Sequence, residues 1–292
     1  MKKIIVKDYT LKNGMDNNLN FLIFSDLHFS INYNKNILNG IKRKVIDIKP
    51  DYIFIVGDII DGLHFVSNED VMNDLFDFLY DLGNLNDKRI PVLVSLGNHD
   101  MDSYDRNNGS LVINDVNYYF NKYIKRFDNK NVYLLNSSYY VDDFIFVYGF
   151  TQNKDSFCKN SYSSDIEYFD SLYSEYNDIY NDRYKVALIH NPINLLDNDI
   201  DDKLRTFNLI LSGHMHNGLV FNFLDKLIKN NYGFISPNRK LFPKNARGII
   251  KHKNNRFNII SGGIIKFQWC SKIFHHFDFI YPAEIDNVIL KK

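Results

Sequence analysis

Apolar residues along the first hundred positions follow two alternating patterns. Four short, nearly continuous apolar runs are typical of strands buried on both faces of a sheet. They lie at residues 4–6, 21–24, 52–56 and 92–95. Residues 36–49 and 68–82 instead carry apolar side chains every three or four positions, which indicates helices that Pro50 and Gly83 end. A turn-like segment at 13–18 joins the first two runs, and the β-α-β-α-β order that follows predicts parallel strands with right-handed crossovers.

The second half of the chain continues with strand-like runs and fewer helical patterns. Further strands are expected at residues 185–189, 207–211, 257–260, 277–280 and 288–290. Residues 139–150 indicate a hairpin that turns at Asp142, and residues 114–127 indicate a helix. The last three runs predict a second, more antiparallel sheet packed on the first. Because no internal repeat or low-complexity linker divides the chain, residues 1–292 are expected to form a single domain.

Polar side chains of three types recur where the apolar runs end. They are Asp26 and His28 after the run at 21–24, Asp58 after 52–56, Asn98 and His99 after 92–95, His190 after 185–189, and His214 and His216 after 207–211. In sheets of this kind, ligands bind beyond the carboxyl ends of the strands. Carboxylate, imidazole and amide oxygen together suit manganese, iron or zinc, and the absence of cysteine from these segments disfavours a structural zinc site. A single histidine in such a place is usually only hydrogen-bonded, but five strand ends together predict a metal site in which Asp58 bridges two cations.

Composition narrows the class of protein and its surroundings. With 45% hydrophobic and 24% charged residues, the 292-residue chain is typical of a soluble globular protein. Its formal net charge of +0 gives no overall attraction to nucleic acid or to an anionic membrane. Cys158 and Cys270 form no CxxC pair, and no stretch resembles a signal peptide or reaches the ~20 apolar residues of a membrane helix. We therefore expect a cytoplasmic protein, with peripheral membrane contact left open.

Two segments depart from this average. Residues 153–182 are polar, acidic and rich in tyrosine and serine, with helical spacing at 165–176. They form either an insertion that caps the site or a solvated surface helix. Residues 226–256 carry nine lysine and arginine residues. This segment is either a solvated basic face or a surface that receives further phosphates of a nucleotide or an acidic head group.

The polar sequence motifs at the strand ends, taken in order, resemble the motif set of the calcineurin-like metallophosphoesterase family. The matching motifs are Asp26-x-His28, Gly57-Asp58-x-x-Asp61, Gly97-Asn98-His99-Asp100, His190 and Gly213-His214-x-His216. Five motifs in the family's order make the resemblance specific. The sequence segments around His190 and His214, together with Pro282-Ala283-Glu284-Ile285, resemble those of the bacterial YkuE/YaeI-like branch of the family.

The resemblance implies a four-layer α/β sandwich, in which two central mixed β-sheets are flanked by helices, and a site that holds two divalent metal ions. Manganese is the first expectation, with iron or zinc as alternatives. One cation would be held by Asp26, His28, Asp58 and His216, and the other by Asp58, Asn98, His190 and His214. His99 would serve as the general acid, with Asp61 orienting its imidazole. The implied reaction is attack of a metal-bridging hydroxide on a phosphodiester or pyrophosphate bond of a small-molecule or lipid-like substrate.

Other functions stay open at this level. Gly62 and Asp100 stand where the protein serine/threonine phosphatases of the family carry Arg and Glu, which weakens a phosphoprotein substrate. A phosphomonoesterase or a nuclease of the same fold is an alternative. The formal net charge of zero and the lack of a basic stripe with stacking aromatic residues weigh against a nucleic-acid substrate. A metal-binding scaffold without turnover is disfavoured by His99 and Asp61, which a scaffold does not need.

Overall fold

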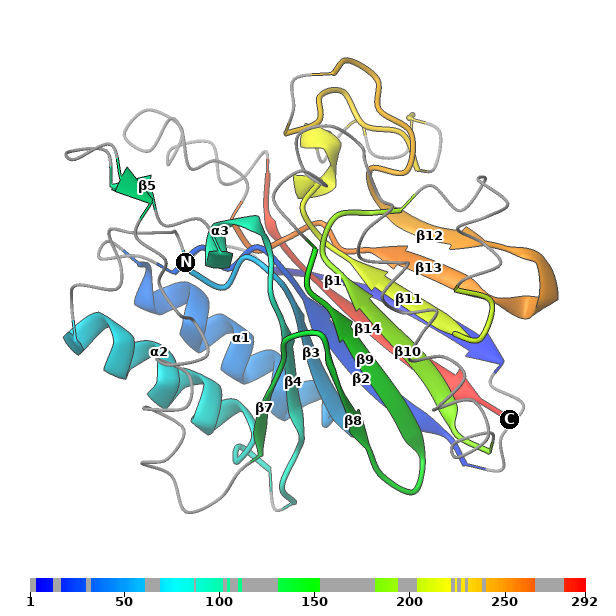
Figure 1. Ribbon diagram of the computed structural model, residues 1–292, viewed down its shortest axis with the longest axis horizontal. Coiled ribbons are helices and arrows are strands. Elements are labelled where there is room, and N and C mark those ends of the chain that lie inside the picture. Colours follow the sequence, from blue (N-terminus) through cyan, green and yellow to red (C-terminus); the bar gives the residue numbers. More distant parts are fainter. Residues whose placement is uncertain are drawn as a thin grey trace.

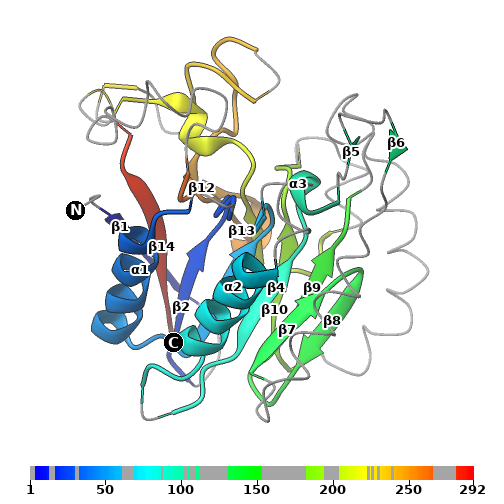
Figure 2. The same ribbon diagram turned by 90° about the vertical axis from the view of Figure 1, so that its left-hand side faces the viewer.

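The computed structural model contains two six-stranded β-sheets that pack face to face (Figure 1, Figure 2). Helices α1 (Lys35–Ile48) and α2 (Glu69–Leu82) lie side by side against the outer face of the first sheet. The two mixed sheets and these helices form the α/β sandwich that the sequence predicts. The structure describes residues 4–12, 17–29, 33–60, 69–86, 88–101, 104–105, 110–111, 131–152, 182–193, 204–221, 224, 227–228, 231–237, 240–265 and 281–292.

The first sheet has the strand order β1-β14-β2-β3-β4-β7. Its strands are β1 (Ile4–Lys12), β2 (Leu19–Phe24), β3 (Tyr52–Val56), β4 (Val92–Ser95), β7 (Val132–Leu135) and β14 (Ala283–Lys291). β2, β3 and β4 pair in parallel with α1 and α2 between them, which confirms the predicted β-α-β-α-β order. The side chain of Asn34 caps the start of α1 by accepting the N–H of Asn36 at 3.0 Å. The helix ends at Lys49, which has a left-handed conformation and directly precedes Pro50.

The second sheet has the order β12-β13-β11-β10-β9-β8. Its strands are β8 (Ser138–Val141), β9 (Ile145–Phe150), β10 (Tyr184–Ile189), β11 (Leu209–Ser212), β12 (Gly248–Lys251) and β13 (Phe257–Ile260). β8 and β9 form the predicted hairpin, and Asp142 closes its turn by accepting the N–H groups of Phe144 and Ile145 at 2.9 and 3.0 Å. β8 and β12 pair antiparallel at the two edges, while the strands between them are parallel. This sheet therefore has two antiparallel pairs against one in the first sheet.

Shorter elements complete the described chain. They are the helix α3 (Asn98–Met101), the paired strands β5 (Tyr104–Asp105) and β6 (Ser110–Leu111), and the 3-10 helices η2 (His216–Leu219) and η4 (Lys253–Asn255). α3 follows β4 directly and η2 follows β11, so both begin at the ends of parallel strands. The chain thus changes direction at the places where the sequence puts its candidate ligands.

The place of the C-terminal strand differs from the sequence-based expectation. The pattern assigns the run at 288–290 to the second sheet, whereas β14 lies in the first, parallel to β1 and antiparallel to β2. β1 and β2 are consequently not neighbours, although only a short segment joins them. The apolar run is shorter than the strand because Glu284, Asp286 and Asn287 interrupt it. Pairing between segments so distant in sequence leaves no local signal, so pattern alone could not place this strand.

Several sequence predictions fall outside the described residues. They are the helix at 114–127, the run at 277–280 and nearly all of the insertion at 153–182. That residues 1–292 form a single domain stays a prediction. Within the described residues, no helix combines the length and the apolar character needed to cross a membrane.

The core consists of three apolar layers parallel to the sheets. Between the sheets, Phe21 and Phe54 of the first pack toward Val186 and Leu211 of the second, together with their neighbours. Behind the first sheet, the apolar faces of α1 and α2 cover β2, β3 and β14. On the outer face of the second sheet, Phe207 and its neighbours cover β9 and β10. Because the sheets are buried on both sides, the ends of their strands are held rigidly.

A core substitution in β14 tests its internal position. Ile285 is fully buried in the layer between the first sheet and its helices. Ile285→Ala should lower the free energy of unfolding by about 2–5 kcal/mol, because it removes buried methylenes and leaves a cavity. Urea unfolding followed by circular dichroism measures this change. Ile46→Ala, on the exposed side of α1 where Ile46 is 45% accessible, should stay within about 0.5 kcal/mol of the parent. Equal costs for the two variants would contradict the placement of β14.

Candidate metal centre

The candidate ligands lie at the ends of five strands drawn from both sheets. Asp26 and His28 follow β2, Asp58 follows β3, Asn98 and His99 open α3 after β4, His190 follows β10, and His214 and His216 follow β11. The carboxylate and imidazole side chains form three groups, and within each group the candidate ligand atoms lie within 4.8 Å of one another. They are Asp26 with His28 and His216, His28 with Asp58 and His99, and Asp58 with His190 and His214. The sites predicted from separate sequence motifs therefore converge on one place.

The backbone at these positions has an uncommon conformation. Five of the predicted ligands have positive φ angles, at Asp26, His28, Asp58, His214 and His216. For residues with a Cβ atom this left-handed region costs roughly 1–2 kcal/mol each. Hydrogen bonds between the ends of β2 and β3 hold the strained segments, with the N–H of Asp26 donating to Gly57 at 3.1 Å and that of His28 to Asp58 at 2.9 Å. Strain of this kind persists only where surrounding structure fixes it, and here it turns the side chains toward a common centre.

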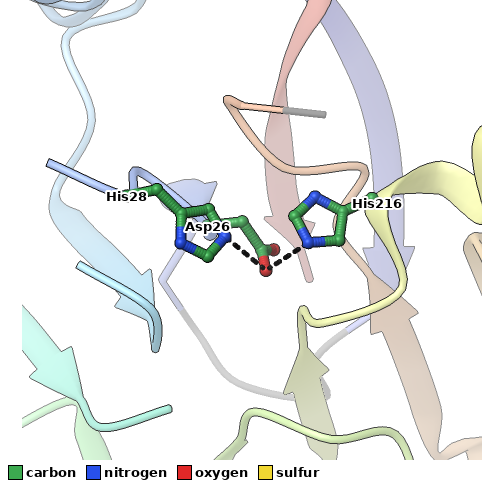
Figure 3. Close-up of side chains that lie close together, drawn as sticks. All are labelled: Asp26, His28 and His216. Carbon is green, nitrogen blue, oxygen red and sulfur yellow. Dashed lines mark ion pairs between the residues drawn. The ribbon is translucent and has the colours of Figure 1, made fainter. Parts of the chain in front are cut away.

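The first group is centred on the carboxylate of Asp26. Figure 3 shows His28 and His216 on either side of this carboxylate, with Asp26 Oδ1 3.9 Å from His28 Nε2 and 3.6 Å from His216 Nε2. The Nδ1–H of His216 donates to the carbonyl of Ile265 at 2.7 Å. This hydrogen bond places the proton on Nδ1, so in the neutral ring the lone pair on Nε2 faces the group.

The other two groups share the carboxylate of Asp58. Its Oδ2 lies 3.0 Å from His190 Nε2 and 3.8 Å from His28 Nε2, which belongs to the first group. Its Oδ1 accepts the backbone N–H of His99 at 2.8 Å. His190 repeats the arrangement of His216, because its Nδ1 contacts the carbonyl of Val56 at 2.7 Å and its Nε2 faces the carboxylate. The carboxylate of Asp58 therefore links the group of His28 and His99 to the group of His190 and His214.

Buried polar atoms at the centre fit a cation. Both ring nitrogens of His28 and the side-chain oxygen of Asn98 are buried and lack a hydrogen-bond partner among the described residues. Leaving such atoms unpaired in a protein interior is costly, so a cation that accepts a lone pair from one His28 nitrogen and from the Asn98 oxygen would stabilise them. Imidazole nitrogen, carboxylate and amide oxygen suit manganese, iron or zinc. The two cysteines, Cys158 and Cys270, lie outside the described residues.

Glycines permit the close packing behind these ligands. Gly57, at φ +72°, lies against the ring of His190, and a Cβ atom there would overlap it. A Cβ atom on Gly97 would collide with the carboxylate of Asp58. Any larger residue at either position would displace the ligand beside it.

Asp100 ties two of the ligand-bearing loops together. Its carboxylate is buried and accepts the N–H groups of Ile59, Ile60 and Gly97 at 2.9, 3.0 and 2.7 Å. Burial, and then the charge of Asp58, raise the pKa of Asp100 to about 7, against the backbone N–H groups that lower it. The residue joins the loop after β3 to the loop after β4, which matches a supporting role. Asp61, the predicted partner of His99, lies outside the described residues.

The loop after β13 also supports the centre, and sequence reasoning does not identify it. Ile264 and Ile265 donate backbone N–H groups to the carbonyls of Ser25 and Asp26, both at 3.0 Å. Glu284 of β14 anchors this loop, because its carboxylate accepts the N–H of Gly262 at 3.0 Å. The available signals were a glycine pair at a strand end and an acidic residue inside an otherwise apolar strand.

Burial and charge set the protonation of the histidines in opposite directions. Burial lowers the pKa of His28 well below its usual value and, helped by His190, lowers that of His214 to about 3. Burial also disfavours the charged form of His190, but the charge of Asp58 outweighs it and raises the pKa to about 9. Burial alone would raise the pKa of Asp58, yet His190 and His28 bring it well below its usual range. At neutral pH, His28 and His214 are therefore ready to donate lone pairs, while His190 shares a proton with Asp58.

This coupling predicts a measurable pH dependence in the metal-free protein. His190 should stay protonated up to about pH 9, because the carboxylate of Asp58 stabilises its charge. In Asp58→Asn that charge is gone and burial remains, so the pKa of His190 should fall toward or below 6.5. NMR titration of the metal-free proteins measures both values, with the signal assigned by a His190→Gln variant. Asp51→Asn, which alters a partly exposed carboxylate paired with Lys88 before β3, should leave the titration unchanged. A pKa of His190 below 6.5 in the parent protein would contradict this coupling.

The chain is similar to several known proteins. A curated relative, the uncharacterized metallophosphoesterase Cj0846 of Campylobacter jejuni, is 27% identical over 224 residues, which are 76% of this chain and 50% of the relative. The chain thus spans about half the length of that relative.

Solved structures with a similar arrangement include a dimetal phosphatase from Danio rerio, with 10% identity, 86% of this chain and 89% of that chain covered, and a TM-score of 0.46. Another is the phosphopantetheinyl hydrolase PptH from Mycobacterium tuberculosis, with 12% identity, 83% and 89% covered, and a TM-score of 0.42.

The family model described as calcineurin-like phosphoesterase matches residues 19–218. These residues include every strand end that carries a candidate ligand, from Asp26 to His216. The YkuE/YaeI-like branch stays a prediction, because the match extends to the family as a whole. The chain belongs to the calcineurin-like phosphoesterase family.

Proposed function

We propose that this protein is a phosphoester hydrolase with a dinuclear metal centre, acting on phosphodiester or pyrophosphate bonds of a small-molecule or lipid-like substrate. The observation that carries the proposal is the position of Asp58. Its Oδ2 lies 3.0 Å from His190 Nε2 and 3.8 Å from His28 Nε2, and these two histidines belong to separate groups of candidate ligands. A carboxylate shared in this way is what a pair of cations requires.

The residues divide into two sets around Asp58. One set is Asp26, His28, Asp58 and His216, and the other is Asp58, Asn98, His190 and His214. Manganese is the first expectation for both positions, with iron or zinc as alternatives. Bound there, two divalent cations would supply the positive charge that neutralises a phosphoryl group and lowers the pKa of water.

The side chains themselves exclude water on one side and leave the other open. Asp26 and His190 are fully buried, whereas His99 and His216 are partly exposed. A substrate therefore approaches from the side of His99 and His216. The carbonyls of Val56 and Ile265 fix the rings of His190 and His216, so little reorganisation is needed when a ligand enters.

The surroundings of His99 support a role as proton donor to the leaving oxygen. Its ring packs edge-on against His28, with centroids 4.7 Å apart, at the open side of the centre. Its backbone N–H is fixed by Asp58, which holds the start of α3 against the centre. We assign His99 as the general acid and Asp61 as the residue that orients it.

Metal-dependent hydrolysis tests the core of the proposal. Metal-stripped protein reloaded with manganese should hydrolyse bis-p-nitrophenyl phosphate, and Asp58→Asn should lose at least about 100-fold in rate because the shared carboxylate is gone. p-Nitrophenyl phosphate, measured in parallel, distinguishes a diesterase from the alternative phosphomonoesterase. Manganese-independent rates, or unchanged rates in Asp58→Asn, would rule out the proposed centre.

The role of His99 gives a sharper expectation. His99→Asn should keep both metals but lower turnover by about 10²–10⁴-fold on a substrate with a poor leaving group, which needs protonation. Diphenyl phosphate should therefore lose more rate than bis-p-nitrophenyl phosphate, whose leaving group is stable as an anion. Equal losses on both substrates would argue against a general acid. Metal content by atomic absorption separates this effect from loss of the centre, and a scaffold without turnover would show no change.

A further inference from the structure

A short β-finger lies between η2 and β12, and it carries two of the three most exposed large apolar side chains of the described chain. Its two arms, residues 233–237 and 240–244, pair antiparallel through Ile235 and Leu241. The N–H of Phe242 donates to the carbonyl of Phe234 at 2.8 Å, and that of Ser236 to the carbonyl of Lys240 at 2.9 Å. In Figure 1 and Figure 2 the yellow-to-orange segment that contains this finger projects beyond the ends of the strands. The finger is therefore an ordered projection with its own hydrogen bonds.

Two consecutive apolar side chains point into solvent on this finger. Leu241 is 68% exposed and Phe242 is 67% exposed, and Ile235 across the pair is 38% exposed. Successive side chains of a regular strand point to opposite faces, so one of two neighbours would ordinarily be covered. Phe242 has a φ of +51°, which breaks the alternation. The backbone thus adopts a strained conformation that leaves both side chains in water.

Lysines flank the exposed pair. Lys240 precedes Leu241, Lys244 follows two positions after Phe242, and both lysines are exposed. Residues 226–256 contain nine lysine and arginine residues and no aspartate or glutamate. Removing these nine from the 35 basic residues of the chain leaves 26 against 35 acidic residues. The formal net charge of zero therefore conceals a basic segment, residues 226–256, in a chain whose other residues carry a net negative charge.

We propose that the two arms of the finger, residues 233–237 and 240–244, form a docking surface for a bilayer that contains anionic phospholipid. Leu241 and Phe242 would enter the interface between head groups and acyl chains, while Lys240 and Lys244 stay among the phosphates. A protein partner fits less well, because two or three side chains at a projecting tip expose far less than the ~800 Å² that each partner of a stable protein interface covers. This docking proposal does not depend on whether the metal centre hydrolyses phosphoesters.

The finger is connected directly to the metal centre. The N–H groups of Phe234 and Ile235 donate to the carbonyl of Gly218 at 2.7 and 3.2 Å. Gly218 lies in η2, two residues after His216, and packs so closely on Gly233 that a Cβ atom on either would overlap the other. Docking of the finger would therefore hold the open side of the centre beside the head groups of the bilayer.

Vesicle flotation of the full chain, without substrate, tests the docking surface. The protein should float with vesicles of phosphatidylcholine and phosphatidylglycerol and much less with phosphatidylcholine alone, and added salt should weaken binding. Leu241→Ser with Phe242→Ser should lower the partition coefficient at least about tenfold, and Lys240→Gln with Lys244→Gln should do so only for the anionic vesicles. The matched control is Ile46→Ser with Phe144→Ser, which changes two exposed apolar residues elsewhere and should bind like the parent.

A fluorescence measurement separates insertion from adsorption by charge alone. Phe242→Trp should shift its emission to shorter wavelength with anionic vesicles, whereas Phe144→Trp should not. Binding without that shift, equal binding to both kinds of vesicle, or equal loss in the control pair would overturn the proposal. The absence of any binding would do so as well. None of these outcomes depends on whether the metal centre hydrolyses phosphoesters.

Discussion

The carboxylate of Asp58 is the contact on which the rest of the centre depends. One of its oxygens accepts the N–H of His99 and so fixes the start of α3 against the end of β3. The other faces His190 from the second sheet and His28 from the neighbouring strand. Three strands of the first sheet and one of the second thus meet at a single buried charge. The sandwich can hold such a charge only because both of its sheets are covered by apolar layers that keep the strand ends in place.

Much of this arrangement was legible in the sequence because its signals are local. Apolar runs predict the strands, helical spacing predicts α1 and α2, and polar residues at strand ends predict the cluster around Asp58. Pairing across long sequence distances was not legible, which is why β14 was assigned to the wrong sheet. The left-handed backbone at Asp26 and His28 was also hidden, because Asp and His adopt that conformation more often than most residues but still only at a small minority of positions. Such angles follow from tertiary hydrogen bonds, so residue type alone does not locate them.

The part of the site that the sequence missed is its scaffold. Glu284 and residues 261–265, the described part of the loop after β13, belong to none of the three ligand groups, yet they hold the backbone around Asp26 and offer the carbonyl that orients His216. Motifs reveal residues whose chemistry is distinctive, whereas a scaffold acts through peptide groups that every residue has. Ligands and scaffold are both necessary, because a ligand displaced by a fraction of an ångström changes the geometry at the metal.

The position of β14 bears on how the protein is made. The ribosome delivers a chain from its N-terminus, so all the ligand-bearing segments emerge before the strand that separates β1 from β2. Until that strand arrives, the first sheet has a gap and the loop after β13 lacks its anchor. A nascent chain therefore presents its carboxylates and imidazoles without their final geometry. The candidate ligands therefore reach their final geometry only after β14 has been synthesised and has paired with β1 and β2.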